Sequence, residues 1–250
     1  MHKLIGVGAF GKVALATHKL TNRKVALKRI EKGNLQEEQI KKVLAEVKLM
    51  SAIRHRHVIR LLEVFETNQY LFMVLEYAPG GDLLHHLKKV KAMTEDEARP
   101  FFRQIVYGIA HCHCRSVLHR DIKLENILIG ENGNAKLCDF GISSLVADPK
   151  KIATDKSGTP PYMSPESFSE EGYSGFMSDI WSLGVLLYTM VCGKLPFSSN
   201  NLVILEQEIR IGLVEVPLYH PRGSFQYSPE IKSLLKEMFR ADPTKRITIP

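Results

Sequence analysis

A break that contains glycine and proline at residues 79–81 divides the chain into two parts with different hydrophobic patterns. Before the break, three runs rich in β-branched and aromatic residues predict strands: residues 25–30, 58–65 and 70–75. One amphipathic helix interrupts these strands, and its helical spacing predicts a buried apolar stripe: Ile40, Val43, Leu44 and Val47. The first part is therefore expected to form a small β-rich lobe.

The part after the break has mainly helical patterns. Residues 180–191 are apolar nearly all round, which is typical of a helix buried in the middle of a domain. Asn132 and Gly133 predict a tight turn between two short strands. The predicted fold class is α+β, with two lobes in a single domain, 1–250. The expected bounds are a small lobe at 1–77, a hinge at 76–81 and a larger helical lobe at 82–250.

The composition excludes several classes of protein. The 250 residues carry a net charge of +7, with 44% hydrophobic and 24% charged residues, which are ordinary values for a globular chain. Four cysteines are too few for a disulfide scaffold and favour a reducing compartment, such as the cytoplasm with access to the nucleus. The basic residues lie in short, separated groups, so neither nucleic acid nor a membrane is expected as a partner.

Three glycines near the start of the chain, Gly6, Gly8 and Gly11, form a G-x-G-x-x-G pattern. A dinucleotide-binding site would need a helix after these glycines, but strand-forming residues follow them. Two strands joined by glycines make a flap whose backbone can lie close over phosphates. The alternative is an ordinary glycine-rich hairpin without a ligand.

A lysine, Lys28, ends the apolar run that begins at Val25. A lysine on a half-buried strand is unfavourable unless its ammonium group contacts an anion. Glu46 lies on the inner side of the predicted amphipathic helix and is the predicted partner. The alternative is an edge-strand lysine whose ammonium group reaches solvent.

A denser group of polar residues follows in the helical part. Asp121, Lys123 and Asn126 supply a base, a cation and an amide within six residues. Asp139, followed by Phe140 and Gly141, comes eighteen residues after Asp121. An aspartate and an asparagine brought together can hold Mg²⁺, which prefers oxygen ligands. The alternative is a solvated polar loop.

These motifs, in this order, resemble the signature set of eukaryotic protein kinases, and the resemblance covers essentially the whole chain. Lys123, two residues after Asp121, resembles the form specific for serine and threonine. Residues 72–77 and 242–247 are most similar to the calmodulin-dependent and AMP-activated kinase group. The resemblance implies transfer of the γ-phosphoryl group of ATP, with Mg²⁺, to serine or threonine hydroxyls of protein or peptide substrates.

The resemblance also assigns roles to single residues. Asp121 would accept the proton of the substrate hydroxyl, and Glu166 would form an ion pair with Arg246. The catalytic set is Asp121, Lys123, Lys28, Asn126 and Asp139, and the metal ligands within it are Asn126 and Asp139. The nucleotide-binding set is Gly6, Val7, Gly8, Gly11, Val13, Ala26, Lys28, Glu46, Leu75, Glu76, Ala78, Asp82, Leu128, Cys138 and Asp139.

Within the nucleotide-binding set, three apolar side chains would enclose the adenine: Val13, Ala26 and Leu128. The backbone of Glu76 and Ala78 would form hydrogen bonds with its edge, and Leu75 would be the gatekeeper behind it. Lys28, paired with Glu46, would hold the α- and β-phosphates.

The activation segment departs from the family pattern. In many relatives a phosphorylated threonine lies eleven residues before the glutamate found here at 166, and in this chain that position is Asp155. One hypothesis is that the Asp155 carboxylate partly replaces the phosphate opposite Arg120. The rival hypothesis is an upstream kinase that phosphorylates one of three residues: Thr154, Ser157 or Thr159. A third possibility is that Asp155 is a solvated loop residue without a role.

Other residues have more than one reading. Asp82 and Glu125 could bind basic residues before the acceptor in a substrate, and Asp82 could equally bind the ribose or cap the following helix. Cys138 is expected near the nucleotide, as a target for electrophiles or simply as a small buried residue. The His and Cys residues at 111–114 are expected to pack in a helix, because residues two apart on a helix do not face each other.

A second function hypothesis is a pseudokinase that acts as a scaffold or allosteric binding module. It is disfavoured because Lys28, Asp121, Asn126 and Asp139 are all present. A kinase for lipids or small molecules is disfavoured by the segment at residues 164–166, and residues 158–160 resemble the loop that receives a peptide acceptor. The catalytic domain is expected to be monomeric and to lack the last helix of its relatives.

Overall fold

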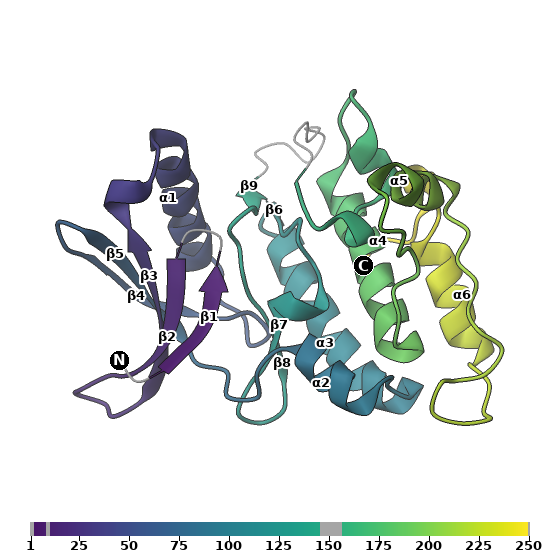
Figure 1. Ribbon diagram of the computed structural model, residues 1–250, viewed down its shortest axis with the longest axis horizontal. Helices are drawn as coiled ribbons and strands as arrows, with labels where there is room; N and C mark the ends of the chain where they lie inside the picture. The colour runs from purple at the N-terminus through teal and green to yellow at the C-terminus, as the bar shows by residue number, and fades with distance from the viewer. Residues whose placement is uncertain (1–2, 9–10, 146–156, 250) are drawn as a thin grey trace.

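The computed structural model describes residues 3–8, 11–145 and 157–249, which form two lobes side by side (Figure 1). The N-terminal lobe, at the left in this view, contains a sheet and helix α1. The C-terminal lobe, at the right, is mostly helical. The predicted α+β class is confirmed.

Five antiparallel strands form the sheet of the N-terminal lobe, in the order β1-β2-β3-β5-β4. Their bounds are β1 Lys3–Gly8, β2 Gly11–Thr17, β3 Lys24–Glu31, β4 Leu61–Glu66 and β5 Tyr70–Glu76. The central strand β3 carries Ala26 and Lys28, which are paired with Leu75 of β5 and Val13 of β2. The sheet therefore places four residues of the predicted nucleotide site on three adjacent strands.

The strand predicted at residues 58–65 begins later than its apolar pattern suggests. Strand β4 starts at Leu61, because Val58 instead forms a β-bridge with Leu137 of the C-terminal lobe. The backbone N–H of Ile59 also donates to the Leu137 carbonyl oxygen, at 2.8 Å. The first apolar residues of this run therefore connect the two lobes.

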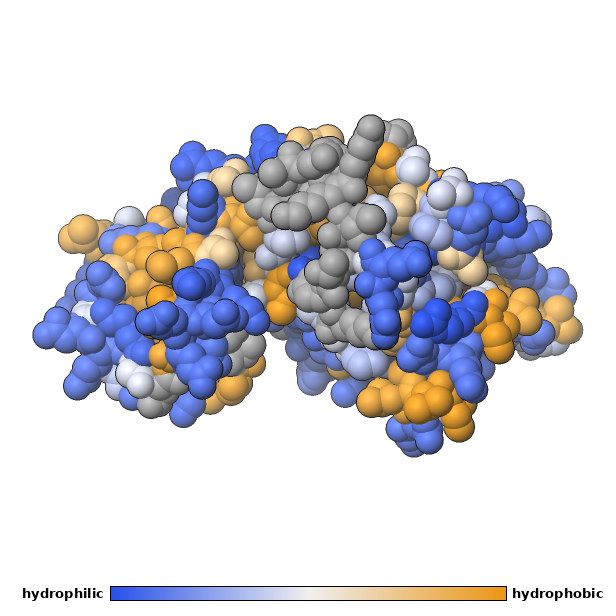
Figure 2. Space-filling view, turned by 90° about the horizontal axis from the view of Figure 1, so that it is seen from above, coloured by the Kyte–Doolittle hydropathy of each residue, from blue (hydrophilic) through white to orange (hydrophobic). Residues whose placement is uncertain are grey.

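Helix α1, Glu37–Ala52, buries a different face from the one that its apolar spacing predicts. Val43 is buried, but Ile40 and Leu44 are 39% and 56% exposed, so the predicted buried stripe is wrong for these two residues. Glu46 is buried instead, because it pairs with Lys28 of β3. Figure 2 shows hydrophobic patches among the hydrophilic residues on one face of the N-terminal lobe.

The C-terminal lobe has five α-helices in the part of the chain that the structure describes. These are α2 Leu83–Val90, α3 Glu95–His113, α4 Gly175–Cys192, α5 Leu202–Ile211 and α6 Pro229–Met238. Four short strands form two small sheets: β6 Val117–Leu118 with β9 Ser144–Leu145, and β7 Ile127–Ile129 with β8 Ala135–Leu137. The predicted hairpin turn between β7 and β8 is confirmed, since Gly133 has a φ of +70°.

Helix α4 forms the centre of this lobe, as its apolar sequence predicts. It is the one described helix that is long and apolar enough to cross a membrane, but 83% of it is buried inside the protein. Trp181 is fully buried and stacks on Phe197 with ring centroids 5.7 Å apart. Helix α4 is therefore the core helix on which the loops of the site rest.

Candidate active site

The glycine motif lies where β1 and β2 meet, and Gly8 is paired with Gly11. A Cβ atom on Gly11 would lie only 2.3 Å from the carbonyl oxygen of Arg29 on β3, so this position requires glycine. A Cβ atom on Gly8 would lie 3.7 Å from Cε of Lys28. The glycines therefore bring the backbone of the flap close to the lysine, while Val7 between them is exposed to solvent.

The predicted ion pair between Lys28 and Glu46 is present. Nζ of Lys28 lies 2.6 Å from Oε1 of Glu46, and both side chains are buried. Oε2 of Glu46 is buried without a hydrogen-bond partner among the described residues, and it lies next to Gly141. The pair therefore holds the lysine beside both the glycine flap and the segment that begins at Asp139.

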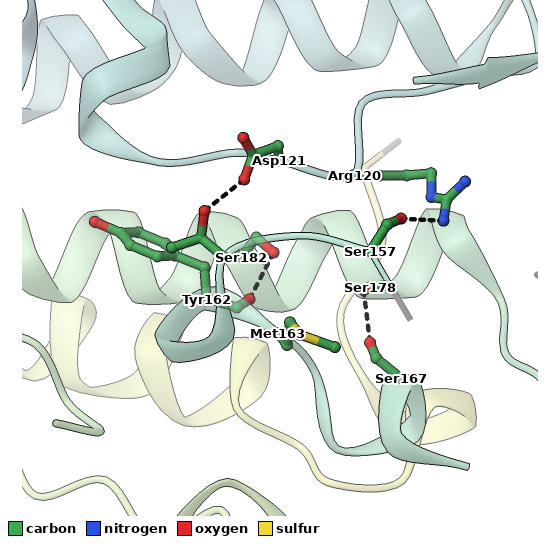
Figure 3. A pocket seen from close by; sticks show the side chains of 9 residues that line it. Arg120, Asp121, Ser157, Tyr162, Met163, Ser167, Ser178 and Ser182 are labelled. Atoms are coloured by element: carbon green, nitrogen blue, oxygen red, sulfur yellow. Dashed lines mark hydrogen bonds between the residues drawn. The ribbon is translucent and has the colours of Figure 1, made fainter. Parts of the chain in front are cut away.

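The carboxylate of Asp121 is held by three donors. Lys123 Nζ lies 2.7 Å from Oδ2, and Asn126 Nδ2 donates to the same oxygen at 3.0 Å. The hydroxyl of Thr159 donates to Oδ1 at 2.8 Å and accepts from Lys123 Nζ at 2.8 Å. Sequence reasoning missed this role of Thr159, because only the fold brings it next to Asp121. Figure 3 shows Asp121 and Arg120 facing Ser157 and the Tyr162 segment across a small pocket.

The two predicted metal ligands, Asn126 and Asp139, lie at the ends of the β7–β8 region. The amide nitrogen of Asn126 donates to the Asp121 backbone oxygen at 2.8 Å and to its carboxylate, which leaves the amide oxygen for another partner. Asp139 has a φ of +64°, and its Oδ1 accepts a long bond, 3.3 Å, from the N–H of Gly141. One amide oxygen and one carboxylate fit Mg²⁺, which usually takes few protein ligands and completes its shell with phosphates and water.

Asp179, near the start of α4, binds the backbone of the loop that carries Asp121. Its two carboxylate oxygens accept the backbone N–H groups of His119, at 3.0 Å, and Arg120, at 2.9 Å. Burial raises the pKa of Asp179, but the hydrogen bonds from His113 and the loop backbone outweigh burial, and its pKa lies below the usual value. The charged acceptor therefore holds the loop just before Asp121. Sequence reasoning missed this role of Asp179, because its partners are backbone groups.

The arrangement agrees with comparisons to known proteins. The protein kinase domain family matches residues 1–250. The chain belongs to the protein kinase domain family. It is 41% identical over 249 residues to the serine/threonine-protein kinase SIK3 homolog of Danio rerio, and 42% identical over 254 residues to the maternal embryonic leucine zipper kinase of Xenopus laevis. It is 39% identical over 249 residues to the serine/threonine-protein kinase SIK2 of Gallus gallus.

These alignments cover all of this chain but only 20%, 37% and 30% of the three relatives, in the same order. Because the family model matches the whole chain and these relatives are serine/threonine kinases, the kinase domain is of the serine/threonine type that uses ATP with Mg²⁺. The predicted similarity to the AMP-activated kinase group is confirmed, and nothing favours a pseudokinase.

The geometry of the kinase domain indicates how its residues would act on a substrate. Asp121 would accept the proton of the incoming hydroxyl, because its carboxylate is fixed and oriented before the substrate binds. Lys123 and Lys28 would stabilise negative charge on the phosphates. Mg²⁺ held by Asn126 and Asp139 would neutralise further charge on the phosphates.

The remaining residues predicted to bind the nucleotide surround the connection between the lobes. Leu75 and Glu76 end β5, and Ala78 follows in the hinge. Leu128 lies on β7, where it forms a bridge with Asp82. Their contacts with adenine stay predictions, but the fold does place them at the same junction of hinge, sheet and hairpin.

Two ambiguous residues of the kinase domain have clear structural roles. Oδ1 of Asp82 accepts the N–H of His85 at 2.7 Å, so Asp82 caps helix α2. Cys138 is half-buried, and burial raises the pKa of its thiol, which disfavours the reactive thiolate. The backbone N–H of Cys138 donates to the backbone carbonyl oxygen of Asn126 at 2.9 Å, and the Cys138 carbonyl oxygen lies 3.1 Å from Nε2 of His119.

The histidines and cysteines of 111–114 lie at the C-terminal end of helix α3. Among the described residues, no group of three or more His, Cys, Asp or Glu side chains could hold a metal ion. His113 instead contacts Asp179 at 2.8 Å, and Cys112 is fully buried. His111 stacks on His55 with ring centroids 4.7 Å apart. Burial, together with the charges of the neighbouring His111 and His57, lowers the pKa of His55 to about 4.

Proposed function

We propose that the protein carrying this domain phosphorylates serine and threonine residues of proteins, with a preference for basic residues before the acceptor. The observation that supports the activity is that the predicted phosphate-binding lysine and the predicted catalytic base are both held in place by their partners. Lys28 is paired with Glu46, and Asp121 is held by Lys123 and Thr159. A scaffold without transfer would not need this arrangement.

The preference for basic substrates is supported by Glu125. This residue is exposed on the loop that carries Asp121. Burial raises the pKa of Tyr162, and the charge of Glu125 raises it further, so the carboxylate lies near the segment that would receive the acceptor. Asp82 gives weaker support, because one of its carboxylate oxygens already caps α2.

The substrate proposal is tested with the purified protein, radiolabelled ATP and a peptide array. Peptides with arginine before serine or threonine should be labelled best, and Glu125→Gln should reduce their kcat/KM about fivefold, since a charge-assisted contact is worth on the order of 1 kcal/mol. The Asp139→Asn variant gives the background. An acidic consensus would contradict the substrate preference, and labelling no higher than Asp139→Asn would contradict the activity itself.

We also propose that the kinase domain has basal activity without phosphorylation of the activation segment, because the Asp155 carboxylate partly replaces the phosphate. Asp155 and Thr154 lie outside the described residues, so the support comes from Arg120, whose guanidinium group contacts the hydroxyl of Ser157. The Arg120 side chain is therefore directed toward this segment. Phosphorylation of Thr159 is a poor activating event, because it would place a phosphate against the Asp121 carboxylate.

Comparing unphosphorylated Asp155→Ala and Thr154→Ala proteins tests this regulation. The Asp155→Ala variant should lose a large part of the basal kcat, roughly threefold to tenfold, because one carboxylate gives only part of the charge of a phosphate. The Thr154→Ala variant should keep its basal activity. Unchanged basal activity in Asp155→Ala would remove the proposal, and would leave an upstream kinase at Thr154 or Ser157 as the explanation.

We propose that the protein is cytoplasmic with access to the nucleus, and that its catalytic domain acts as a monomer. All four cysteines are free, which supports a reducing compartment. Cell fractionation and light scattering of the purified protein test the two statements.

A further inference from the structure

Lys136, on β8, is a charged residue that no part of the predicted chemistry uses. Its side chain is only 11% exposed, and Nζ lies 2.7 Å from Oε1 of Glu76, at the end of β5 where the hinge begins. The same Nζ donates to the backbone oxygen of Arg56, in the segment that follows α1, at 3.0 Å. One ammonium group thus connects the β7–β8 hairpin, which carries it, to two other segments of the chain: the hinge and the segment after α1.

Both carboxylate oxygens of Glu76 are used in this arrangement. Oε1 binds Lys136, while Oε2 accepts the backbone N–H of Arg60 at 3.3 Å. The backbone N–H of Glu76 donates in turn to the Arg60 carbonyl oxygen at 2.9 Å. The side chain and the backbone of Glu76 are therefore fixed from two directions, just where its backbone is expected to meet the adenine.

The β7–β8 hairpin is also bound to the lower end of the hinge. Gly80 N–H donates to the Ile129 carbonyl oxygen at 2.9 Å, and Ile129 N–H donates to the Gly81 carbonyl oxygen at 2.8 Å. In the hairpin, Lys136 is directly opposite Leu128. Directly opposite residues of an antiparallel pair have side chains on the same face, so Lys136 lies beside the residue expected to contact the adenine ring.

We propose that Lys136 is a positioning residue for the nucleotide. It acts through Glu76 and fixes the hinge edge of the adenine site relative to Leu128. The proposal rests on ATP as the substrate of the domain and adds to it a residue that does not itself touch the nucleotide. Without the ammonium group, the Glu76 carboxylate keeps its bond to Arg60 but loses its direct contact with the hairpin. The backbone bonds of Gly80 and Gly81 to Ile129 remain, so the position of the hinge changes at Glu76 rather than at its other end.

The test measures ADP affinity by calorimetry and steady-state kinetics for Lys136→Met, which keeps the length of the side chain without its charge. The Kd for ADP and the KM for ATP should each rise about fivefold, which corresponds to about 1 kcal/mol. The kcat at saturating ATP and the KM for the peptide should stay within twofold. Lys136→Arg should restore nucleotide affinity to near the wild-type value, because it retains the charge.

Two further variants distinguish positioning from general stability. Glu76→Gln should give the same loss of nucleotide affinity, and the double variant with Lys136→Met should be no worse than either single variant. Lys32→Met is the matched control, because Lys32 follows β3 and its ion pair with Glu66 of β4 joins side chains that are 35% and 67% exposed. It should leave all constants unchanged.

Several results would overturn the proposal. One is an unchanged Kd for ADP in Lys136→Met. Another is a parallel fall in kcat and rise in the KM for the peptide, which would indicate a merely structural role. Full additivity of the two single variants would show that Lys136 does not act through Glu76. The calorimetric measurement needs no phosphoryl transfer, so failure of the positioning role and failure of the kinase activity would be distinguishable.

Discussion

Replacing Asp121 with asparagine should lower kcat about a hundredfold to ten-thousandfold, because general-base assistance contributes typically 10²–10⁴-fold and the amide cannot accept the proton. The substitution keeps the size and shape of the side chain. The hydrogen bond from Thr159 can remain, since the amide oxygen still accepts. The KM for ATP should change little, because the nucleotide contacts are expected on other residues.

This prediction is checked by steady-state kinetics with a peptide substrate, together with the melting temperature of each protein. Asp96→Asn is a matched control, because its carboxylate is 95% exposed on α3 and lies far from the catalytic loop in sequence. It should retain full activity. If Asp121→Asn kept more than a tenth of the wild-type kcat, the assignment of Asp121 as the base would be wrong.

The second large effect is expected on stability, from replacing Arg246 with methionine. The two guanidinium nitrogens of Arg246 lie 2.6 and 2.9 Å from the two carboxylate oxygens of Glu166, as the sequence predicts for this pair. The Arg246 side chain is fully buried, and the group also donates to backbone oxygens and lies over the ring of Trp181. Its loss would leave a buried carboxylate without its partner.

Breaking a buried pair by removing one partner costs about 3–5 kcal/mol, so the melting temperature of Arg246→Met should fall on the order of 10 °C. Arg240→Met is the control, because its pair with Glu237 is 44% and 38% exposed and should contribute at most about 1 kcal/mol. If Arg246→Met does not fold, Arg246→Lys keeps the charge and should show an intermediate loss. Equal melting temperatures for the Arg240 and Arg246 variants would contradict the prediction.

The sequence predicts the catalytic residues well, because their spacing is local. Asp121, Lys123 and Asn126 lie on one short loop, and the structure brings them into mutual contact. The pair of Lys28 and Glu46 is also predictable, since each residue has an unusual position on an apolar element. These assignments depend on neighbours in the sequence or on a strong physical need for a partner.

Contacts between distant segments could not be predicted in the same way. Asp179 binds the backbone of a loop 59 and 60 residues earlier, and backbone groups leave no mark in the sequence. Lys136 has the appearance of an ordinary surface lysine until the fold places Glu76 beside it. The exposure of Ile40 and Leu44 could not be predicted for a related reason: hydrophobic spacing marks an apolar face, but only the fold shows which part of that face has another element packed against it.

The pair of Arg246 and Glu166 has a consequence for how the chain folds during synthesis. All five strands of the N-terminal sheet lie within residues 3–76, so this sheet can form as soon as that segment leaves the ribosome. The C-terminal lobe has no such early end point, because Glu166 must wait for a partner made 80 residues later. At typical synthesis rates of about 5–20 residues per second, the carboxylate remains unpaired for roughly 4–16 seconds. During that interval the nascent chain has a nearly complete small lobe and an exposed, half-built large one, which is when assistance from chaperones would matter most.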